Sequence, residues 1–432
     1  MADKSGNKIT YFKPINGKPR TAFEDGSWKN PKQEGPLGKI RWNNWTQGTM
    51  AVHAGALRGE TGPHVFVPMY TGTTCPALTC GELAKRFANA GVDGKMGKIY
   101  ARFGTQSGFE LECILAGMHE CGDALVFGSG MAAISQVFLS LVAAGDNVVV
   151  HRTMYGCTDG LCSKILPELG IEVRYVDLKD PKVLGEAIDE RTRAVFFETP
   201  ANPTLDLIDI KAVVKEVKNR CPVVVDNTFA SPLGQNPFEQ GANVVVYSMT
   251  KSIGGHSDAL GGAILGSGKF IANLYPLRND FGGVLPAREA ASFLVGIKTL
   301  KIRYEKMQEN ARELAKILKS NSKVEKVYYP EFDKSYPLDG QMKGPGYMIS
   351  FVLKDGLGAG KKFVEGLRLI TNAVSLGGVE SLVCHPASTT HSGVNAEQRK
   401  AKGIVDGLIR FSVGCEDLGD LKKDLQKGLD SI

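Results

Sequence analysis

Two side chains in the middle of the sequence could do chemistry together. Lys251 follows the apolar run NVVVYS, and Asp226 ends the apolar run PVVVD. Ser248 and Thr250 place hydroxyl groups suited to a phosphate beside the lysine. A lysine amine can form an imine with an aldehyde, and a buried acid can hold a proton on a basic ring nitrogen. Taken alone, a lysine at a strand end is usually a solvated surface residue, and Asp226 could be a helix cap.

A phosphate site is indicated by Gly128-Ser129-Gly130, which lies between the apolar run ALVF and a helical pattern. The segment formally matches the dinucleotide motif G-x-G-x-x-A, but that motif needs an acid where the next strand ends in His151. Glycines still let backbone N–H groups and a helix N-terminus approach a phosphate, the alternative being a tight turn without a ligand. A phosphate cradle, a lysine and a carboxylate at strand ends together indicate pyridoxal 5'-phosphate.

The elements that must position these residues are alternating strands and helices. Apolar runs rich in β-branched residues predict strands over 124–127, 147–151, 172–176, 193–198, 222–226 and 243–248. Helical patterns separate them, which predicts a mostly parallel sheet covered on both faces, an open α/β domain. Because chemistry in such sheets lies at the carboxyl ends of the strands, we expect those ends to converge on one edge.

The last third of the chain has a looser pattern. Residues 288–320 predict one long helix or two, and two further helices are predicted over 359–368 and 417–430. Strands are predicted over 347–353, 373–375 and 408–413. We therefore expect a smaller C-terminal α+β domain. The predicted division is 1–103 for an N-terminal arm and intersubunit segment, 104–290 for the large domain and 291–432 for the small domain.

Composition limits the classes of partner. The chain has 432 residues, 43% of them hydrophobic, which is ordinary for a globular protein. Its net charge of +6 is uneven, because residues 1–41 hold nine Lys/Arg and four Asp/Glu. This arm mixes both signs and is broken by Gly and Pro, unlike the clustered basic face of a nucleic-acid-binding protein. We expect a polar arm that lies on a partner subunit, and no nucleic-acid partner.

The cysteines indicate the compartment. The nine cysteines form no CxxC pair, which argues against structural zinc, and we expect no metal. Their odd number and the lack of an apolar signal core at the N-terminus indicate a reducing, cytoplasmic location. No stretch approaches the roughly 18 apolar residues of a membrane span, so no membrane partner is expected.

From about Val52 to its C-terminus, the sequence resembles the pyridoxal-phosphate enzymes of Cys/Met metabolism, the trans-sulfuration family. The most specific matching segments are SMTKSIGGHSD, ETPANPT, VVVDNTF, SLGGVESLVCHPASTTHS and GLIRFSVGCED. The family includes cystathionine synthases and lyases, methionine γ-lyase and the acyl-homoserine sulfhydrylases. The resemblance implies fold type I, the aspartate aminotransferase-like fold, with a mostly parallel sheet in the large domain.

The resemblance also implies roles around the cofactor. Lys251 would be the Schiff-base lysine, Asp226 the partner of the pyridine nitrogen, and Asn202 a neighbour of the 3-oxygen. The phosphate would be held by Ser129, Gly130, Met131, Ser248 and Thr250.

Further roles concern the substrate and a second subunit. Tyr155 would stack on the ring and could protonate the departing thiolate. Tyr100 and Arg102 would reach the phosphate of a neighbouring subunit's cofactor. Arg410 would clamp the substrate carboxylate, with Ser375 near it. The family's tetramers, built from dimers with shared active sites, imply a homo-oligomer that acts on a small sulfur amino acid.

The member of the family is indicated by two positions. Most of the family has glycine at the position of Cys157, and a cysteine there resembles methionine γ-lyase. Cys157 could also be a small residue that only fills space. Val374 precedes Ser375 where cystathionine γ-lyases have glutamate, and an apolar residue suits a short methylthio tail. We expect a carbon–sulfur lyase that converts L-methionine, or a related γ-substituted amino acid, to 2-oxobutyrate, ammonia and a thiol, with Lys251, Tyr155 and Cys157 as catalytic residues.

Other activities remain open. HPASTTH at 385–391 is more similar to the sulfhydrylases, so O-acetylhomoserine sulfhydrylase is the first alternative, followed by cystathionine γ-lyase or γ-synthase. A non-catalytic scaffold is a third, against which Lys251, Asp226 and Arg410 argue. The segment YARFGTQS departs from the family's YSRxxNPT, Ser252 replaces the usual Tyr after the lysine, and Val295 replaces an Arg. These departures concern the substrate and the intersubunit contacts more than the cofactor.

Overall fold

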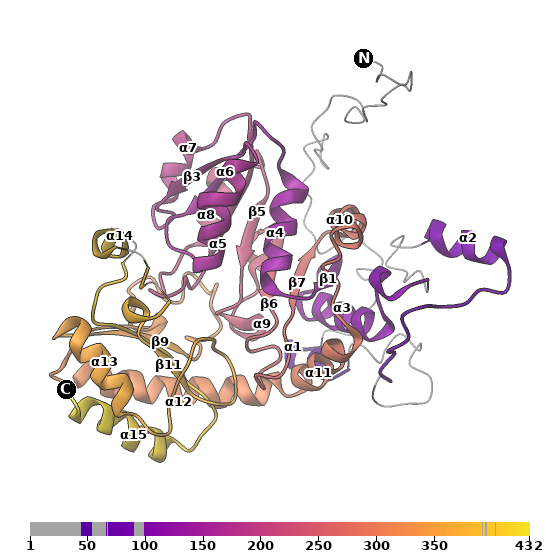
Figure 1. The fold of residues 1–432 in the computed structure, drawn as a ribbon. Helices are drawn as coiled ribbons and strands as arrows, with labels where there is room; N and C mark the ends of the chain where they lie inside the picture. The colour runs from indigo at the N-terminus through magenta and orange to yellow at the C-terminus, as the bar shows by residue number, and fades with distance from the viewer. Residues whose placement is uncertain are drawn as a thin grey trace, which may run out of the picture.

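Two β-sheets and the helices that cover them make up the protein (Figure 1). The computed structural model describes residues 45–53, 66, 68–89, 99–390, 392–393, 395–401 and 403–432. The predicted polar arm of residues 1–41 lies outside these residues. Within the described part of the chain, no helix is long and apolar enough to cross a membrane.

The larger sheet has seven strands in the order β1-β7-β6-β5-β4-β2-β3. Its strands are β1 (Asp123–Phe127), β2 (Asn147–His151), β3 (Glu172–Val176), β4 (Thr192–Glu198), β5 (Val223–Asp226), β6 (Val244–Ser248) and β7 (Gly262–Gly266). The neighbours from β6 to β3 pair in parallel, whereas β7 is antiparallel to both β1 and β6. The six strands predicted from apolar runs are confirmed, and so is the mostly parallel α/β fold.

Helices cover both faces of this sheet because successive strand residues point to opposite sides. Val245 of β6 belongs to a buried cluster with Leu115 of α3 (Gln106–His119) and Phe293 of α11 (Ala287–Lys298). Val246 belongs to the cluster on the other face, with Val137 of α4 (Gly130–Leu141). The other helical segments of this region are α5 (Gly156–Gly160), a π-helical turn (Leu161–Ile165), α6 (Leu166–Glu168), α7 (Leu184–Ala187), α8 (Ile210–Val217), α9 (Ser231–Gly234) and α10 (Gly268–Phe281).

The smaller sheet has five strands in the order β10-β11-β12-β9-β8. Its strands are β8 (Val324–Tyr328), β9 (Met348–Leu353), β10 (Thr371–Asn372), β11 (Leu382–Cys384) and β12 (Leu408–Ser412). It shares a buried cluster with α12 (Leu300–Ser320), α13 (Gly356–Gly366) and α15 (Leu418–Asp430). The region predicted as one helix or two is two helices, α11 and α12. The boundary predicted between 290 and 291 falls inside α11 and stays a prediction.

One predicted strand is wrong. Residues 373–375 form no strand, because β10 ends at Asn372 and Ser375 has a φ of 87°. That left-handed backbone conformation cannot continue a strand.

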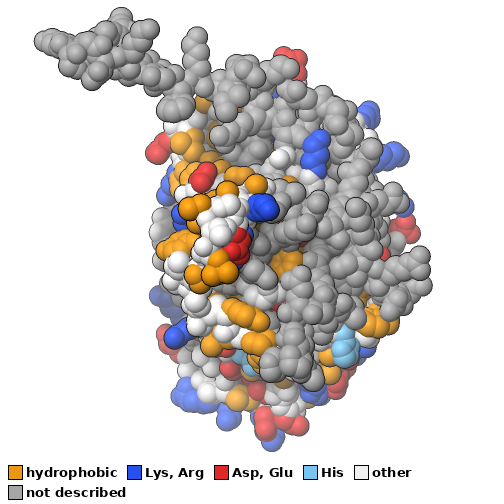
Figure 2. All heavy atoms as spheres, turned by 90° about the vertical axis from the view of Figure 1, so that its right-hand side faces the viewer, with side chains coloured by type: hydrophobic (Ala, Val, Ile, Leu, Met, Phe, Trp, Pro, Cys, Tyr) orange, Lys and Arg blue, Asp and Glu red, His pale blue; other side chains and the backbone are white. Residues whose placement is uncertain are grey.

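The remaining elements lie at the ends and loops of the chain. They are α1 (Gln47–His53), α2 (Cys80–Asn89), α14 (Ala396–Ala401) and the 3₁₀ turns Ala101–Phe103, Pro181–Val183, Pro237–Gln240, Pro330–Phe332 and Pro386–Ser388. Figure 2 shows apolar side chains gathered on the face that carries α2. Large apolar side chains exposed in the segment before α3 include Met69, Tyr70, Leu78, Phe87 and Tyr100, of which Leu78 is 97% exposed.

Candidate active site

The carboxyl ends of the parallel strands converge on one edge of the large sheet, as predicted. Glu198 at the end of β4 pairs in register with Asp226 at the end of β5. Ser248, the last residue of β6, pairs with Gly262, and Gly262 also pairs with Phe127 at the end of β1. The loops that carry Ser129, Asn202 and Lys251 all leave the sheet at this edge.

The predicted phosphate loop packs tightly on the ends of β6 and β7. A Cβ atom on Gly130 would lie 2.8 Å from the Cβ atom of Ser248, and one on Gly262 would lie 2.2 Å from the carbonyl oxygen of Ser129. Both glycines are therefore required for this close approach. The Ser129 hydroxyl caps α4 by accepting a hydrogen bond from the N–H of Ala132 at 3.0 Å. The loop thus holds the N-terminus of α4, a favourable place for an anion, against Ser248.

Thr250 and Met131 flank this loop. The Thr250 hydroxyl accepts a hydrogen bond from the N–H of Gly261 at 3.0 Å, which ties the segment before Lys251 to the segment that enters β7. The Met131 sulfur accepts a weak hydrogen bond from the Thr158 hydroxyl at 3.8 Å. Their expected contacts with a phosphate stay predictions.

Lys251 and Asp226 both lie in environments that disfavour charge. Burial, with a smaller contribution from the charge of Arg410, lowers the pKa of Lys251 to about 8. The Lys251 Nζ donates a hydrogen bond to the Ser375 Oγ at 2.9 Å. Burial also raises the pKa of Asp226, whose Oδ1 accepts from the N–H of Thr228 at 2.9 Å. A buried carboxyl of this kind gains most from a cationic partner.

The smaller sheet contributes Arg410 from β12. Its Nη1 donates to the Asn202 Oδ1 at 3.2 Å, and its Nη2 donates to the carbonyl oxygen of Ser375 at 2.9 Å. The side chain is buried, although it faces the edge of the large sheet where Asn202 lies. Arg410 is thereby joined to Asn202 and to Ser375, and Ser375 in turn is joined to Lys251.

Tyr155 and Cys157 lie together after β2. The Cys157 Sγ lies 3.4 Å from the Tyr155 hydroxyl oxygen, and this hydrogen bond, together with burial, raises the pKa of Tyr155 to about 12. Cys157 is exposed, and Tyr155 is partly buried, with 44% of its surface exposed. Cys157 is therefore not a buried filler residue.

Tyr100 and Arg102 lie elsewhere. Arg102 donates to the carbonyl oxygen of Asn279 in α10 at 2.7 Å, and its guanidinium carbon lies 5.9 Å from the centre of the Tyr100 ring. Tyr100 is 45% exposed on the apolar face that carries α2. These contacts do not join the pair to the Lys251 site of the same chain, and their predicted reach into a neighbouring subunit stays a prediction.

Sequence reasoning missed Glu198. Its Oε1 accepts from the N–H of Tyr155 at 2.7 Å, and its Oε2 accepts from the N–H of Asn202 at 3.3 Å. Burial, with the nearby charge of Asp226, raises the pKa of Glu198 to about 8. The signal was present in RAVFFE, an apolar strand that ends in an acid in the same way as PVVVD.

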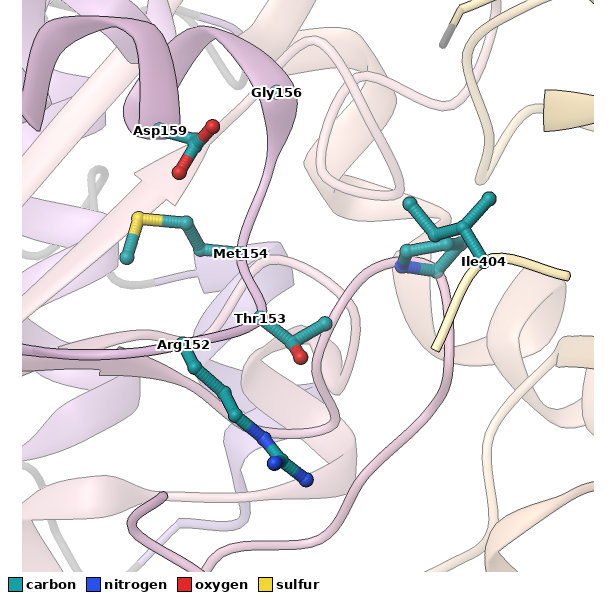
Figure 3. A pocket seen from close by; sticks show the side chains of 7 residues that line it. Arg152, Thr153, Met154, Gly156, Asp159 and Ile404 are labelled. Carbon is teal, nitrogen blue, oxygen red and sulfur yellow. The ribbon is translucent and has the colours of Figure 1, made fainter. Parts of the chain in front are cut away.

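A small pocket lies beside Tyr155 (Figure 3). It is lined by Arg152, Thr153, Met154, Gly156, Asp159, Pro203 and Ile404. Figure 3 shows Ile404, which precedes β12, facing the loop after β2. This is a place where the part of the chain that forms the small sheet meets the part that forms the large one.

The fold and its strand-end lysine and acid match the pyridoxal-phosphate-dependent enzymes of fold type I. The chain belongs to the Cys/Met metabolism PLP-dependent enzymes, whose family model matches residues 48–430. It is 40% identical over 394 residues to an L-methionine gamma-lyase of Fusobacterium nucleatum subsp. polymorphum, covering 89% of this chain and 98% of that one. A cystathionine gamma-lyase of Dictyostelium discoideum is 38% identical, with 90% of this chain and 98% of that one covered.

A solved structure extends the comparison to the cofactor. The putative O-acetylhomoserine (thiol)-lyase of Campylobacter jejuni superposes with a TM-score of 0.84 at 28% identity, covering 90% of this chain and 100% of that one, and it contains N'-pyridoxyl-lysine-5'-monophosphate. Pyridoxal 5'-phosphate is therefore the cofactor of this family. The residues present fit it, because a buried acid, a buried amine of lowered pKa and a glycine-lined helix N-terminus meet at one edge.

Proposed function

We propose that this PLP-dependent lyase performs γ-elimination on L-methionine, consuming water and releasing 2-oxobutyrate, ammonia and methanethiol. The observation that carries the proposal is the pairing of Cys157 with Tyr155 at 3.4 Å, a cysteine where most of the family has glycine. Val374, 59% exposed and next in the chain to Ser375, adds an apolar surface suited to a methylthio group. The L-methionine gamma-lyases that align over 89% of the chain support the same substrate.

Different residues of the chain are assigned to different steps of the proposed reaction. Pyridoxal phosphate, when bound, supplies an electron sink for negative charge at the substrate's Cα. Asp226 holds a proton on the ring nitrogen, and Arg410 binds the substrate carboxylate with two parallel N–H groups. Lys251, as a neutral amine, removes the Cα proton. Loss of a Cβ proton then expels the γ-thiolate, to which Tyr155 gives a proton. Cys157 orients the Tyr155 hydroxyl.

The cofactor's phosphate and the assembly belong to the same proposal. Ser129, Gly130, Met131, Ser248 and Thr250 hold the phosphate at the start of α4, and Asn202 lies by the 3-oxygen. The active form is a homotetramer built from two dimers, in which Tyr100 and Arg102 reach a neighbouring subunit's site. The exposed apolar side chains around α2 support a subunit contact on that face.

A side-by-side assay tests the substrate. Purified protein loaded with pyridoxal phosphate is given methionine, cystathionine or O-acetylhomoserine, each with and without sulfide. We expect 2-oxobutyrate and methanethiol from methionine without sulfide. The proposal would be overturned if the protein made homocysteine from O-acetylhomoserine and sulfide but no 2-oxobutyrate from methionine. That result would indicate a sulfhydrylase, an activity that the similarity to the Campylobacter jejuni structure makes the first alternative. A protein that gains no visible absorbance with the cofactor would be a scaffold.

A further inference from the structure

We infer that Glu198 is a positioning residue that sets the two sides of the cofactor site by holding the backbones of Tyr155 and Asn202. One carboxylate oxygen accepts from the N–H of Tyr155 at 2.7 Å, and the other accepts from the N–H of Asn202 at 3.3 Å. Glu198 is only 5% exposed. A single side chain therefore joins the loop after β2 to the loop after β4.

The position of this carboxyl group is costly for the fold alone. Glu198 and Asp226 are register partners at the ends of neighbouring parallel strands, so two acids are buried side by side. Burial of like charges opposes ionisation of both, and an apolar residue at the end of β4 would avoid that cost. The two backbone hydrogen bonds that Glu198 accepts offset this cost, because a buried N–H group without an acceptor is itself unfavourable.

The two held residues lead directly to groups assigned to cofactor and substrate. Tyr155 carries the ring-facing phenol, and the Asn202 side chain accepts from Arg410 Nη1 at 3.2 Å. Displacing either backbone would tilt the cofactor ring or shift the guanidinium that binds the substrate carboxylate. The inference rests on the proposed site around Lys251 but not on the identity of the substrate.

Glutamine provides the sharpest substitution. Glu198→Gln keeps the shape of the side chain but replaces one acceptor oxygen with an NH₂ group, which faces one of the two backbone N–H groups as a second donor. Glu190→Gln is the matched control, since Glu190 is exposed and precedes the other end of β4.

The test titrates unloaded wild type and variants with pyridoxal phosphate and records visible absorbance and circular dichroism. For Glu198→Gln we expect cofactor affinity to fall about tenfold and the visible dichroism per bound cofactor to change, with Glu190→Gln equal to wild type. A stability role alone would lower the melting temperature without changing the dichroism of bound cofactor. Wild-type affinity and dichroism in Glu198→Gln would overturn the inference. A wild type that binds no cofactor would instead overturn the proposed site.

A second variant covers loss of folding, which far-ultraviolet dichroism of the unloaded protein reports. If Glu198→Gln does not fold, Glu198→Asp takes its place in the same titration. Aspartate keeps both acceptor oxygens but is one methylene shorter, so it cannot reach both N–H groups at their present positions. We expect an intermediate loss of affinity and altered dichroism. Wild-type values in Glu198→Asp would overturn the inference.

Discussion

The Lys251 Nζ lies 2.9 Å from the Ser375 Oγ, although the two residues are 124 positions apart and belong to loops of different sheets. Ser375 presents its hydroxyl from a backbone with a φ of 87°, a conformation that costs a serine on the order of 1–3 kcal/mol. The neighbouring Arg410 holds the Ser375 carbonyl in place at 2.9 Å. Strain in one sheet's loop is thus used to place a hydroxyl on the amine that the other sheet presents.

The lowered pKa of Lys251 predicts how fast the unloaded protein captures pyridoxal phosphate. With a pKa of about 8, only the neutral amine is nucleophilic, so the capture rate rises about tenfold per pH unit below that value and levels off above it. An amine of ordinary pKa would keep gaining until about pH 10.4. Stopped-flow absorbance between pH 6 and 10 measures the profile.

Lys251→Ala is the control for that profile. After borohydride reduction, this variant should retain cofactor only at the background level given by the other lysines, at every pH. A rate in wild type that keeps rising past pH 9 would contradict the lowered pKa, and unchanged attachment in Lys251→Ala would refute the role of this amine.

Asp226→Asn should leave folding intact and reduce turnover. The amide oxygen can still accept from the N–H of Thr228, but the side chain no longer carries the charge that keeps a ring nitrogen protonated. We expect kcat on methionine to fall at least about 100-fold. Asp177→Asn, which weakens a partly exposed ion pair with Arg152 at 2.8 Å, should have wild-type kcat. Equal kcat in both variants would remove Asp226 from the site.

Arg410→Lys tests the binding of the substrate carboxylate. Lysine keeps the positive charge but cannot donate in two parallel directions, so charge-assisted hydrogen bonds worth about 1.5–3 kcal/mol are weakened. We expect KM to rise roughly 10- to 100-fold, with a smaller effect on cofactor affinity. Arg152→Lys, which changes a half-exposed arginine that lines the small pocket of Figure 3, should leave KM unchanged. A KM unaffected in Arg410→Lys would place the carboxylate elsewhere.

Gly262→Ala should destabilise the protein, because its Cβ would lie 2.2 Å from the Ser129 carbonyl oxygen. Backbone must move to relieve that overlap, at a cost of about 1–3 kcal/mol in the free energy of unfolding. Gly185→Ala in α7 meets nothing within 4 Å and should be neutral or slightly stabilising. Urea denaturation of the unloaded proteins measures both. A neutral Gly262→Ala would show that the phosphate loop does not pack this closely.

The large sheet could be predicted because most of its strands are continuous apolar runs in the sequence. Val223, Val224 and Val225 are buried on both faces, and a run of β-branched residues is typical of such strands. β7 was missed, since GAILG is short and bounded by glycines, and β8 was missed because all five of its residues are at least partly exposed. Residues 373–375 were predicted as a strand from propensity, which tertiary contacts override at Ser375.

The site could be predicted only as far as the edge of the sheet. The rule that chemistry lies at the carboxyl ends of strands located Asp226, Ser248 and Lys251 without any knowledge of contacts. The contacts themselves are tertiary: Arg410 reaches Asn202 across 208 positions, which no spacing reveals. RAVFFE marks Glu198 as an acid that ends a strand, but the sequence does not show which backbone N–H groups this acid binds.

The antiparallel strand β7 has a kinetic consequence. Ser248 and Gly262 are paired neighbours, so the segment carrying Lys251 departs and returns at the same point of the sheet, and the Thr250 N–H donates to the Gly261 carbonyl at 3.3 Å to close it further. In the proposed reaction, an amine held in this way would not move far when an incoming amino acid displaces it. Its effective concentration stays high throughout a turnover, and it is already at hand when the product departs.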